Sequence, residues 1–371
     1  MTDRIHNFGA GPGVLPEPVL RQAQQDLWEI GGSGIGIAEH SHRGKVFDRI
    51  ITDAEEEARR LAGIPDNYKV LFIQGGATQQ FAMVPMNLLS TGGVADYLLT
   101  GVWAEKALKE AKKFGTTHVA VSGEALRFTR IPPVAEIKYS ASPAYVHVTT
   151  NNTIYGTQWK TEPPVPEGIP LVADTSSDMF SRPIDVSKYG LIYAGAQKNL
   201  GPAGIVMVIM RADLADAAPT SLPTMLQYRT YVKERSLYNT PPTFAIYMVG
   251  LVLKWIRVTG GLASMAERNE EKARLLYDFL DQSALFQAPV HPDSRSLMNI
   301  VFRCPTEELD AKFLSEAGKR GLEGLKGHRS AGGMRASVYN ACPRASVVAL
   351  VDFMKEFEVA NRGPAGSSVH V

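Results

Sequence analysis

The chain has 371 residues, of which 44% are hydrophobic and 21% are charged. A chain of this length and composition folds into two or three globular domains with a full-sized core, which excludes disorder as its main state. The 39 Lys and Arg residues nearly balance the 38 Asp and Glu residues, so the net charge is +1. This balance argues against a broad nucleic-acid-binding surface, and any cationic site must be built locally.

The sequence contains no segment typical of a membrane or secreted protein. The longest nearly apolar stretch, Phe244 to Leu253, is shorter than the roughly 18 residues that can span a bilayer. Residues 1–7 lack the apolar core of a signal peptide. The two cysteines, Cys304 and Cys342, provide neither a disulfide framework nor a Cys-based metal cluster. We therefore expect a cytoplasmic enzyme with no metal site, no membrane association and no nucleic-acid partner.

From about residue 68 the chain alternates short apolar runs with helical patterns. The expected strands are 70–73, 95–99, 118–121, 145–149, 170–173, 191–194 and 204–210. Helices are expected over 77–90 and 103–113. This alternation predicts an α/β fold with a mostly parallel sheet that is covered on both faces.

The C-terminal third predicts a smaller α+β domain. Its expected helices are 243–258, 262–283, 306–320 and 344–360, with strands at 297–303 and near Ser337. The Pro- and Gly-rich stretch 161–170 is interpreted as a loop, because strand signals continue after it. We expect a large domain over 16–259, a small domain formed by 1–15 and 260–361, and a disordered tail over 362–371.

A single lysine, Lys198, stands between two apolar strand candidates. It ends the segment Tyr193-Ala-Gly-Ala-Gln-Lys198, and a Gly/Pro turn leads from it into the next strand. A lysine in such a place is costly unless it is paired, covalently modified or facing a cavity. Lys198 is either a loop lysine that reaches solvent or a Schiff-base lysine whose amine is made nucleophilic by desolvation or a cationic neighbour.

Asp174 ends another strand candidate upstream of Lys198. Alone, an Asp at the end of a strand is more often the N-cap of a helix. Enzymes that use pyridoxal phosphate (PLP), however, need a carboxylate against the pyridine nitrogen, because the protonated ring is the better electron sink. Asp174 and Lys198 would both project from the carboxyl ends of strands, where open α/β sheets bind ligands.

Two weaker signals lie at the ends of earlier strands. Gly75-Gly76 precedes a helix and is either a plain tight turn or a loop that holds a phosphate with free N–H groups. It fits neither the P-loop pattern nor the dinucleotide fingerprint. Trp103 either packs in the core or stacks on a planar cofactor ring.

Taken together, several segments resemble the phosphoserine aminotransferase family, whose members are class-V aminotransferases of PLP-dependent fold type I. They keep the order of that family and span about residues 6 to 357. The segments are Ser41–Lys45, Tyr68–Phe72 with Gly75-Gly76, Ser181–Val186, Tyr193–Asn199 with Gly201–Gly204, Tyr238–Phe244, and Lys326–Arg329 with Gly332–Ser337. The resemblance implies a large PLP-binding domain with a mostly parallel central sheet and a smaller C-terminal α+β domain.

The resemblance also implies roles for single residues around the cofactor. Lys198 is the expected Schiff-base lysine, Asp174 the partner of the pyridine nitrogen, and Trp103 the ring that stacks on the cofactor. Thr153 is expected to bond the 3′-hydroxyl oxygen. The expected phosphate ligands are Gly76, Ala77 and Gln197, with Asn239 and Thr240 from the other subunit of a homodimer that shares its active sites. Other members carry Gly-Arg or Ala-Ser where this chain has Ala77-Thr78, so only backbone contacts are expected at Ala77.

Basic residues gather in two short segments, where isolated Arg-His pairs would be ordinary surface charge. Phosphoserine carries a phosphate and a carboxylate and glutamate carries two carboxylates, groups that guanidinium binds through two parallel hydrogen bonds. In the family Arg335 matches the clamp for the α-carboxylate. The pocket for the distal phosphate or carboxylate matches His328 and Arg329, with His42 and Arg43 contributed across the dimer.

The activity implied by the resemblance is that of a phosphoserine transaminase. It would run a ping-pong exchange between O-phospho-L-serine and 3-phosphohydroxypyruvate on one side and glutamate and 2-oxoglutarate on the other, in serine biosynthesis. The resemblance also suggests 4-phosphohydroxythreonine of pyridoxine biosynthesis as a substrate.

Three other functions are weighed against it. An alanine–glyoxylate-type transaminase would not need His328 and Arg329. A cysteine desulfurase needs a mobile, reactive Cys near PLP, and neither Cys304 nor Cys342 stands in such a place. A non-catalytic relative would have lost the lysine or the aspartate, and both remain.

Overall fold

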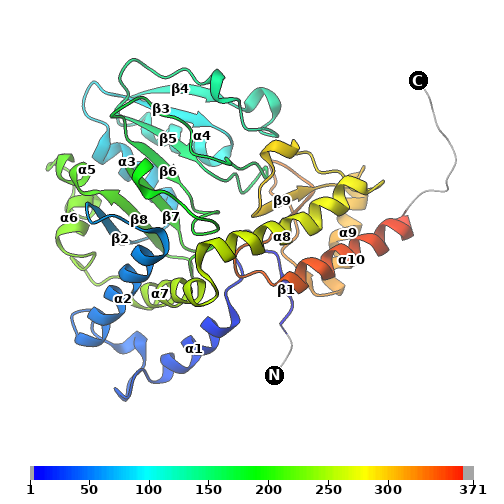
Figure 1. Cartoon of the computed structure of the whole chain (residues 1–371), viewed down its shortest axis with the longest axis horizontal. Helices are drawn as coiled ribbons and strands as arrows, with labels where there is room; N and C mark the ends of the chain where they lie inside the picture. Colours follow the sequence, from blue (N-terminus) through cyan, green and yellow to red (C-terminus); the bar gives the residue numbers. More distant parts are fainter. Residues whose placement is uncertain (1–3, 362–371) are drawn as a thin grey trace.

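A computed structural model describes residues 4–361, which form a large α/β body beside a smaller α+β body (Figure 1). The tail expected to be disordered, 362–371, lies outside the described residues. The domain boundaries given by the sequence stay predictions.

A seven-stranded sheet forms the centre of the large body. Its strands lie in the order β2 (Tyr68–Gln74), β8 (Ile205–Arg211), β7 (Leu191–Gly195), β6 (Leu171–Asp174), β5 (Tyr145–Thr149), β3 (Val94–Leu99) and β4 (Thr116–Ser122). Strands β7, β6, β5, β3 and β4 are parallel, and β8 runs antiparallel to its neighbours β7 and β2. The sheet is therefore mostly parallel, as predicted, and the carboxyl ends of its parallel strands meet at one edge.

Helices cover both faces of this sheet, because its strands are apolar on both sides. Ala173 and Ile192 face the core that contains α2 (Lys45–Ala62) and α7 (Thr243–Val258), whereas Val172 and Tyr193 face the opposite core. The helices of the second face are α3 (Ala77–Leu88), α4 (Val102–Ala111), α5 (Ala212–Ala217) and α6 (Tyr228–Lys233).

The helix α8 (Gly261–Gln282) leads from the large body into the small one (Figure 1). There β9 (Asn299–Phe302) pairs antiparallel with β11 (Met334–Ser337). The helices α9 (Glu307–Lys319) and α10 (Arg344–Asn361) contact each other in the core of the same body. The N-terminal strand β1 (His6–Asn7) pairs with β10 (Leu322–Glu323), and Phe8 is buried in the core of the small body. The first residues of the chain therefore pack with its C-terminal part.

Some elements differ from the prediction. The helices α1 (Glu17–Trp28) and α2 were not predicted. Cys304, placed by the sequence in a strand region, follows the end of β9 and is buried. Single 3₁₀ turns lie at Ile37–Glu39, Glu124–Leu126, Val134–Glu136, Val186–Lys188, Thr224–Leu226 and Pro292–Ser294.

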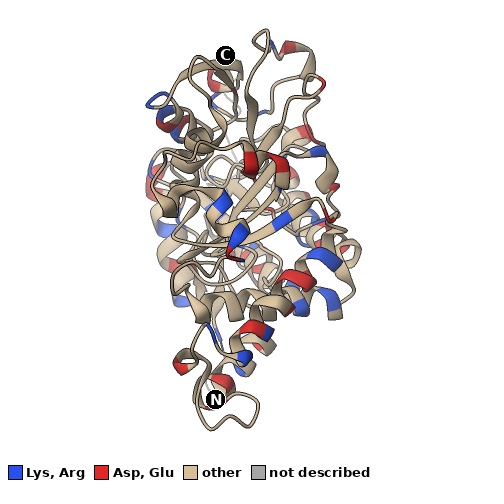
Figure 2. Ribbon diagram, turned by 90° about the vertical axis from the view of Figure 1, so that its left-hand side faces the viewer, with Lys and Arg blue, Asp and Glu red and all other residues tan. Residues whose placement is uncertain are grey.

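Acidic and basic residues are interspersed along the ribbon (Figure 2). Within residues 4–361, no single helix has both the length and the apolar character needed to cross a bilayer. Helices α7 and α8 meet these criteria only as a pair, and they are bent by 84° at their junction.

Candidate active site

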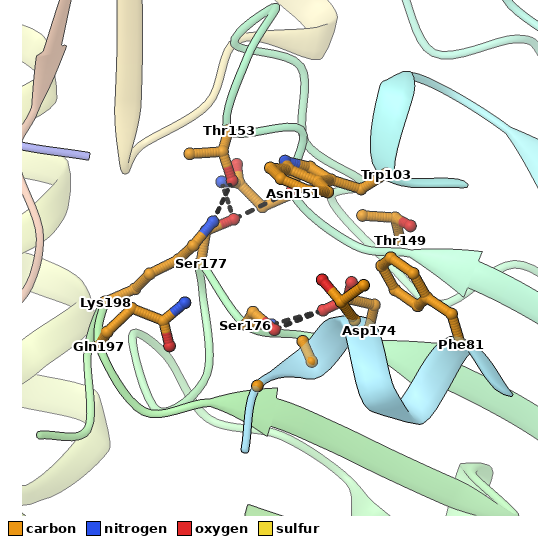
Figure 3. A pocket seen from close by; sticks show the side chains of 13 residues that line it. Phe81, Trp103, Thr149, Asn151, Thr153, Asp174, Ser176, Ser177, Gln197 and Lys198 are labelled. Carbon is orange, nitrogen blue, oxygen red and sulfur yellow. Dashed lines mark hydrogen bonds between the residues drawn. The ribbon is translucent and has the colours of Figure 1, made fainter. Parts of the chain in front are cut away.

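A pocket opens where the parallel strands β5, β6 and β7 end (Figure 3). It brings together most of the residues that the sequence proposed for a cofactor. Its lining consists of Gly76, Ala77, Thr78, Phe81, Trp103, Thr149, Asn151, Thr153, Asp174, Ser176, Ser177, Gln197 and Lys198.

Lys198 lies in the turn between β7 and β8, which is fixed by backbone hydrogen bonds. The N–H of Ala196 donates to the carbonyl of Ile205 at 3.0 Å, which continues the pairing of the two strands into the turn. The N–H of Gly13, from the N-terminal segment, donates to the carbonyl of Gln197 at 2.7 Å. The lysine backbone is thus held from two sides while its side chain points into the pocket (Figure 3).

The Lys198 amine is prepared to act as a base. Its Nζ donates to Oγ1 of Thr153 at 2.7 Å. Burial lowers the pKa of Lys198 to about 8, and the opposing attraction of Asp174 does not cancel that effect. A lysine with this pKa is uncharged far more often at neutral pH than an exposed one, and the uncharged amine is the nucleophile.

Asp174 is the last residue of β6 and keeps one oxygen for a ligand. Ser176 donates to its Oδ1 twice, from the backbone N–H at 3.0 Å and from the hydroxyl at 2.6 Å. Burial raises the pKa of Asp174, while the hydrogen bonds of Ser176 and the charge of Lys198 act in the opposite direction. Within the described chain no donor bonds to Oδ2. The buried carboxylate therefore suits a cationic N–H donor.

The start of α3 forms a cradle of free N–H groups. Gly75 has φ of +103°, a conformation that favours glycine. A Cβ there would lie 2.3 Å from Oε1 of Gln79, the end of a flexible side chain that can move aside, so the backbone conformation and not the space requires glycine. The N–H groups of Gly76, Ala77 and Thr78 bond to no acceptor in residues 4–361. These amides and the helix dipole are suited to an anion such as a phosphate.

The pocket also contains buried polar atoms that lack a partner. Nε1 of Trp103 and Oγ1 of Thr149 make no hydrogen bond within the described part of the chain. The Asp174 oxygen matches the pyridine nitrogen of PLP, the amine of Lys198 matches its carbonyl carbon, and the amide cradle matches its phosphate. The two unpartnered atoms of Trp103 and Thr149 are further polar groups that such a ligand can contact. The residues present therefore fit this cofactor.

The predicted carboxylate clamp lies next to the lysine. Arg335, on β11 of the small body, donates from Nη1 to the carbonyl of Thr153 at 3.0 Å, and its Nε has no partner among residues 4–361. Burial lowers the pKa of Arg335. Burial and the positive charges of Arg335, Arg329 and Lys106 lower the pKa of His328, so each of these cations lies within electrostatic range of that imidazole.

The remaining predicted residues are not brought to this pocket. His42 and Arg43 lie before α2, where Nε of Arg43 donates to Nε2 of His42 at 3.4 Å. Asn239 and Thr240 are exposed on the loop that precedes α7. Neither pair lines the pocket of its own chain, so their predicted roles require a second subunit.

The sequence analysis missed Ser176, which supports both key residues. Its hydroxyl donates to Asp174 and accepts the N–H of Gly195 at 3.0 Å, at the end of the strand that leads to Lys198. The signal was present in Asp174-Thr-Ser176, because an Asp that accepts the N–H two residues later forms an Asx turn. Thr149 was missed as well, since nothing in its strand distinguishes it from a core threonine.

Comparisons with known proteins extend over almost the whole chain. The Aminotransferase class-V family model matches residues 5–350. A curated phosphoserine aminotransferase of Desulfosudis oleivorans is 55% identical over 363 residues, covering 97% of this chain and 100% of the relative. The solved phosphoserine aminotransferase of Bacillus circulans subsp. alkalophilus superposes with a TM-score of 0.96 at 51% identity, covering 97% of this chain and 100% of that one. The PLP-bound enzyme of that name from Trichomonas vaginalis has a TM-score of 0.91 at 39% identity and covers 95% of this chain and 100% of its own.

Proposed function

Since the chain belongs to the aminotransferase class-V family, we propose that it is a phosphoserine aminotransferase. It is a PLP-dependent enzyme of serine biosynthesis that moves an amino group between O-phospho-L-serine and 2-oxoglutarate. One observation carries this proposal. Lys198 donates to the hydroxyl of Thr153 and Arg335 donates to the carbonyl of the same residue, so a reactive amine and a carboxylate-binding guanidinium meet at one point.

The cofactor would be held by the residues that fit its parts. Lys198 is the proposed point of attachment, Asp174 the partner of the pyridine nitrogen, and Trp103 the stacking ring. Thr153 would bond the 3′-hydroxyl oxygen, and Gln197 and the amide cradle would bind the phosphate. When bound, PLP supplies the electron sink that makes the Cα–H bond of an amino acid acidic.

The chain's own residues perform the remaining work. Arg335 binds the α-carboxylate and so fixes the Cα–H bond relative to Lys198. The uncharged form of the Lys198 amine, which the lowered pKa makes more available than in an exposed lysine, takes the Cα proton at Nζ and returns it on the other side of the exchange. The bonds from Ser176 favour the charged form of Asp174 against the effect of burial, and its carboxylate would hold a proton at the pyridine nitrogen. Trp103 covers the pocket and excludes water.

The active enzyme is proposed to be a homodimer with shared sites. His42, Arg43, Asn239 and Thr240 are the residues that a partner subunit would supply. None of these residues lines the pocket of its own chain, and a phosphate-bearing substrate carries more negative charge than Arg329 alone balances, which supports this arrangement.

The test is an absorbance spectrum of the purified holoenzyme before and after addition of amino acids. A visible band near ~410–430 nm that moves to ~330 nm is the signature of amino transfer in an enzyme whose cofactor is the electron sink. We expect O-phospho-L-serine and glutamate to cause the shift rapidly and L-alanine to cause it far more slowly. Lys198→Ala should lack the starting band. A band that alanine shifts and phosphoserine does not would overturn the proposed substrate.

A further inference from the structure

Lys106 lies beside the Trp103 ring that lines the pocket. We propose that Lys106 is a substrate-binding residue whose ammonium group binds the distal phosphate or carboxylate of the substrate. This inference rests on the proposed function and deepens it. Lys106 would then help the enzyme to select doubly anionic substrates over amino acids with uncharged side chains.

The position of Lys106 follows from the helix that carries Trp103. The two residues are three apart on α4, so they lie on the same face of the helix. Nζ of Lys106 lies 4.5 Å from the centre of the Trp103 ring. Nζ of Lys198 lies 5.6 Å from the centre of the same ring. The indole thus has the reactive amine and a second, exposed ammonium group as neighbours.

The charges around Lys106 call for an anion. Lys106, Arg329 and Arg335 each lie close enough to His328 to disfavour a positive charge on that imidazole, so His328 is a neighbour that all three cations share. No carboxylate of residues 4–361 forms an ion pair with Lys106, Arg329 or Arg335. Positive groups that converge without an acidic partner repel one another, and a bound anion relieves this repulsion.

The chemistry of lysine suits a phosphate at this point. Its ammonium group is a compact charge with three donors on a flexible stem, so it follows a phosphate without a fixed geometry. Arg335 instead offers a planar fork, which suits the α-carboxylate. The neutral imidazole of His328 adds a donor without more charge. The guanidinium of Arg335 thus binds the α-carboxylate, and the ammonium group of Lys106 binds the distal group.

The experiment compares single-turnover rates of three holoenzyme variants with the wild type. Lys106→Met removes the charge and keeps the length, Lys106→Arg keeps the charge, and Lys109→Met is the matched control one turn further along α4. Each is mixed with O-phospho-L-serine and, separately, with L-alanine, which has no distal anion. Isothermal titration of each holoenzyme with inorganic phosphate measures anion binding without turnover.

We expect Lys106→Met to lower the second-order rate constant of the single turnover with phosphoserine by about 10- to 100-fold, as for one lost hydrogen bond to a charged group. The rate with alanine should stay unchanged, phosphate should bind more weakly, Lys106→Arg should recover most of the loss, and Lys109→Met should behave as wild type.

An equal loss with both amino acids would mean that Lys106 only supports Trp103, and no loss would mean that it has no role; either result overturns the inference. If the wild type fails to use phosphoserine at all, the proposed function falls. In that case the phosphate titration still decides on Lys106, since unchanged binding in Lys106→Met contradicts the inference.

Discussion

At the scale of single residues, the reactivity of Lys198 comes from burial that the carboxylates of Asp174 and Asp178 only partly offset. Burial lowers its pKa to about 8, against 10.5 for an ordinary lysine, and Asp174 acts in the opposite direction. The pKa of Lys198 is therefore shifted downward. The uncharged form of Lys198 appears at a lower pH than that of an ordinary lysine, and removing the Asp174 charge extends this difference.

This balance predicts the labelling of the cofactor-free protein by acetic anhydride, which reacts with uncharged amines. We expect acetylation of Lys198 to rise with pH around a midpoint near pH 8, as the lowered pKa requires. In Asp174→Asn the midpoint should move to lower pH. Mass spectrometry of the peptide that contains Lys198 gives both profiles. A midpoint near that of a free lysine side chain, or a shift to higher pH in Asp174→Asn, would contradict this account.

At the scale of elements, a buried polar network joins the small body to the turn of Lys198. The backbone N–H of Asn340, just after β11, donates to the side-chain oxygen of Asn199 at 3.0 Å. The side-chain amide of Asn269 donates to the side-chain oxygen of Asn340 at 2.8 Å. From α8, Nζ of Lys272 donates to the carbonyls of Val338 and Tyr339 at 3.0 and 2.6 Å. The segment after the Arg335 strand is therefore tied to the residue that follows Lys198.

The buried Lys272 makes this junction dependent on pH. Burial lowers its pKa from 10.5 to about 8, so the unfolded chain binds more protons than the folded one between these values. The contribution of Lys272 to stability is therefore depressed below pH 8 and recovers as the pH rises toward 10.5.

We expect Lys272→Met to be more destabilising at pH 10 than at pH 7, by about 2–3 kcal/mol, as a shift of this size implies. At pH 10 the variant loses two hydrogen bonds, whereas at pH 7 it also escapes the cost of a buried charge. Urea unfolding of the cofactor-free protein at both pH values measures the difference, with Lys254→Met on the exposed face of α7 as control. Equal destabilisation at both pH values would refute the role of burial.

These elements also show where prediction from sequence succeeds. Strands that are buried on both faces read as continuous apolar runs, so the range 145–149 was predicted as the structure has it. Helix α2 was overlooked although its buried residues Phe47, Ile51, Ala54, Ala58 and Ala62 recur at helical spacing. Lys198 and Asp174 stood out because charged residues rarely follow buried strands. The approach of Arg335 to Thr153 joins distant parts of the chain and leaves no pattern in either segment.

At the scale of the whole molecule, one chain contains only part of the proposed site. Arg43 lies on the segment that follows α1, outside the pocket that contains Lys198. The same region exposes large apolar side chains: Trp28 is 87% exposed, Leu27 46% and Ile35 40%. Neighbouring exposed apolar groups of this size are typical of protein interfaces. This surface is consistent with a dimer in which each subunit lends Arg43 to the other.

Shared sites predict that two inactive variants restore activity when their subunits mix. In a heterodimer of Lys198→Ala and Arg43→Ala, one site receives both intact residues and the other receives neither. After subunits are exchanged at equal amounts, about half of the dimers are mixed, so activity should reach about a quarter of the wild-type value.

The control is Lys198→Ala with Arg329→Ala. Both residues are proposed to come from the same subunit, so mixing cannot reunite them and activity should not rise above that of Arg329→Ala alone. Steady-state transamination before and after subunit exchange measures both cases, and recovery in neither pair would show that Arg43 does not act across a dimer.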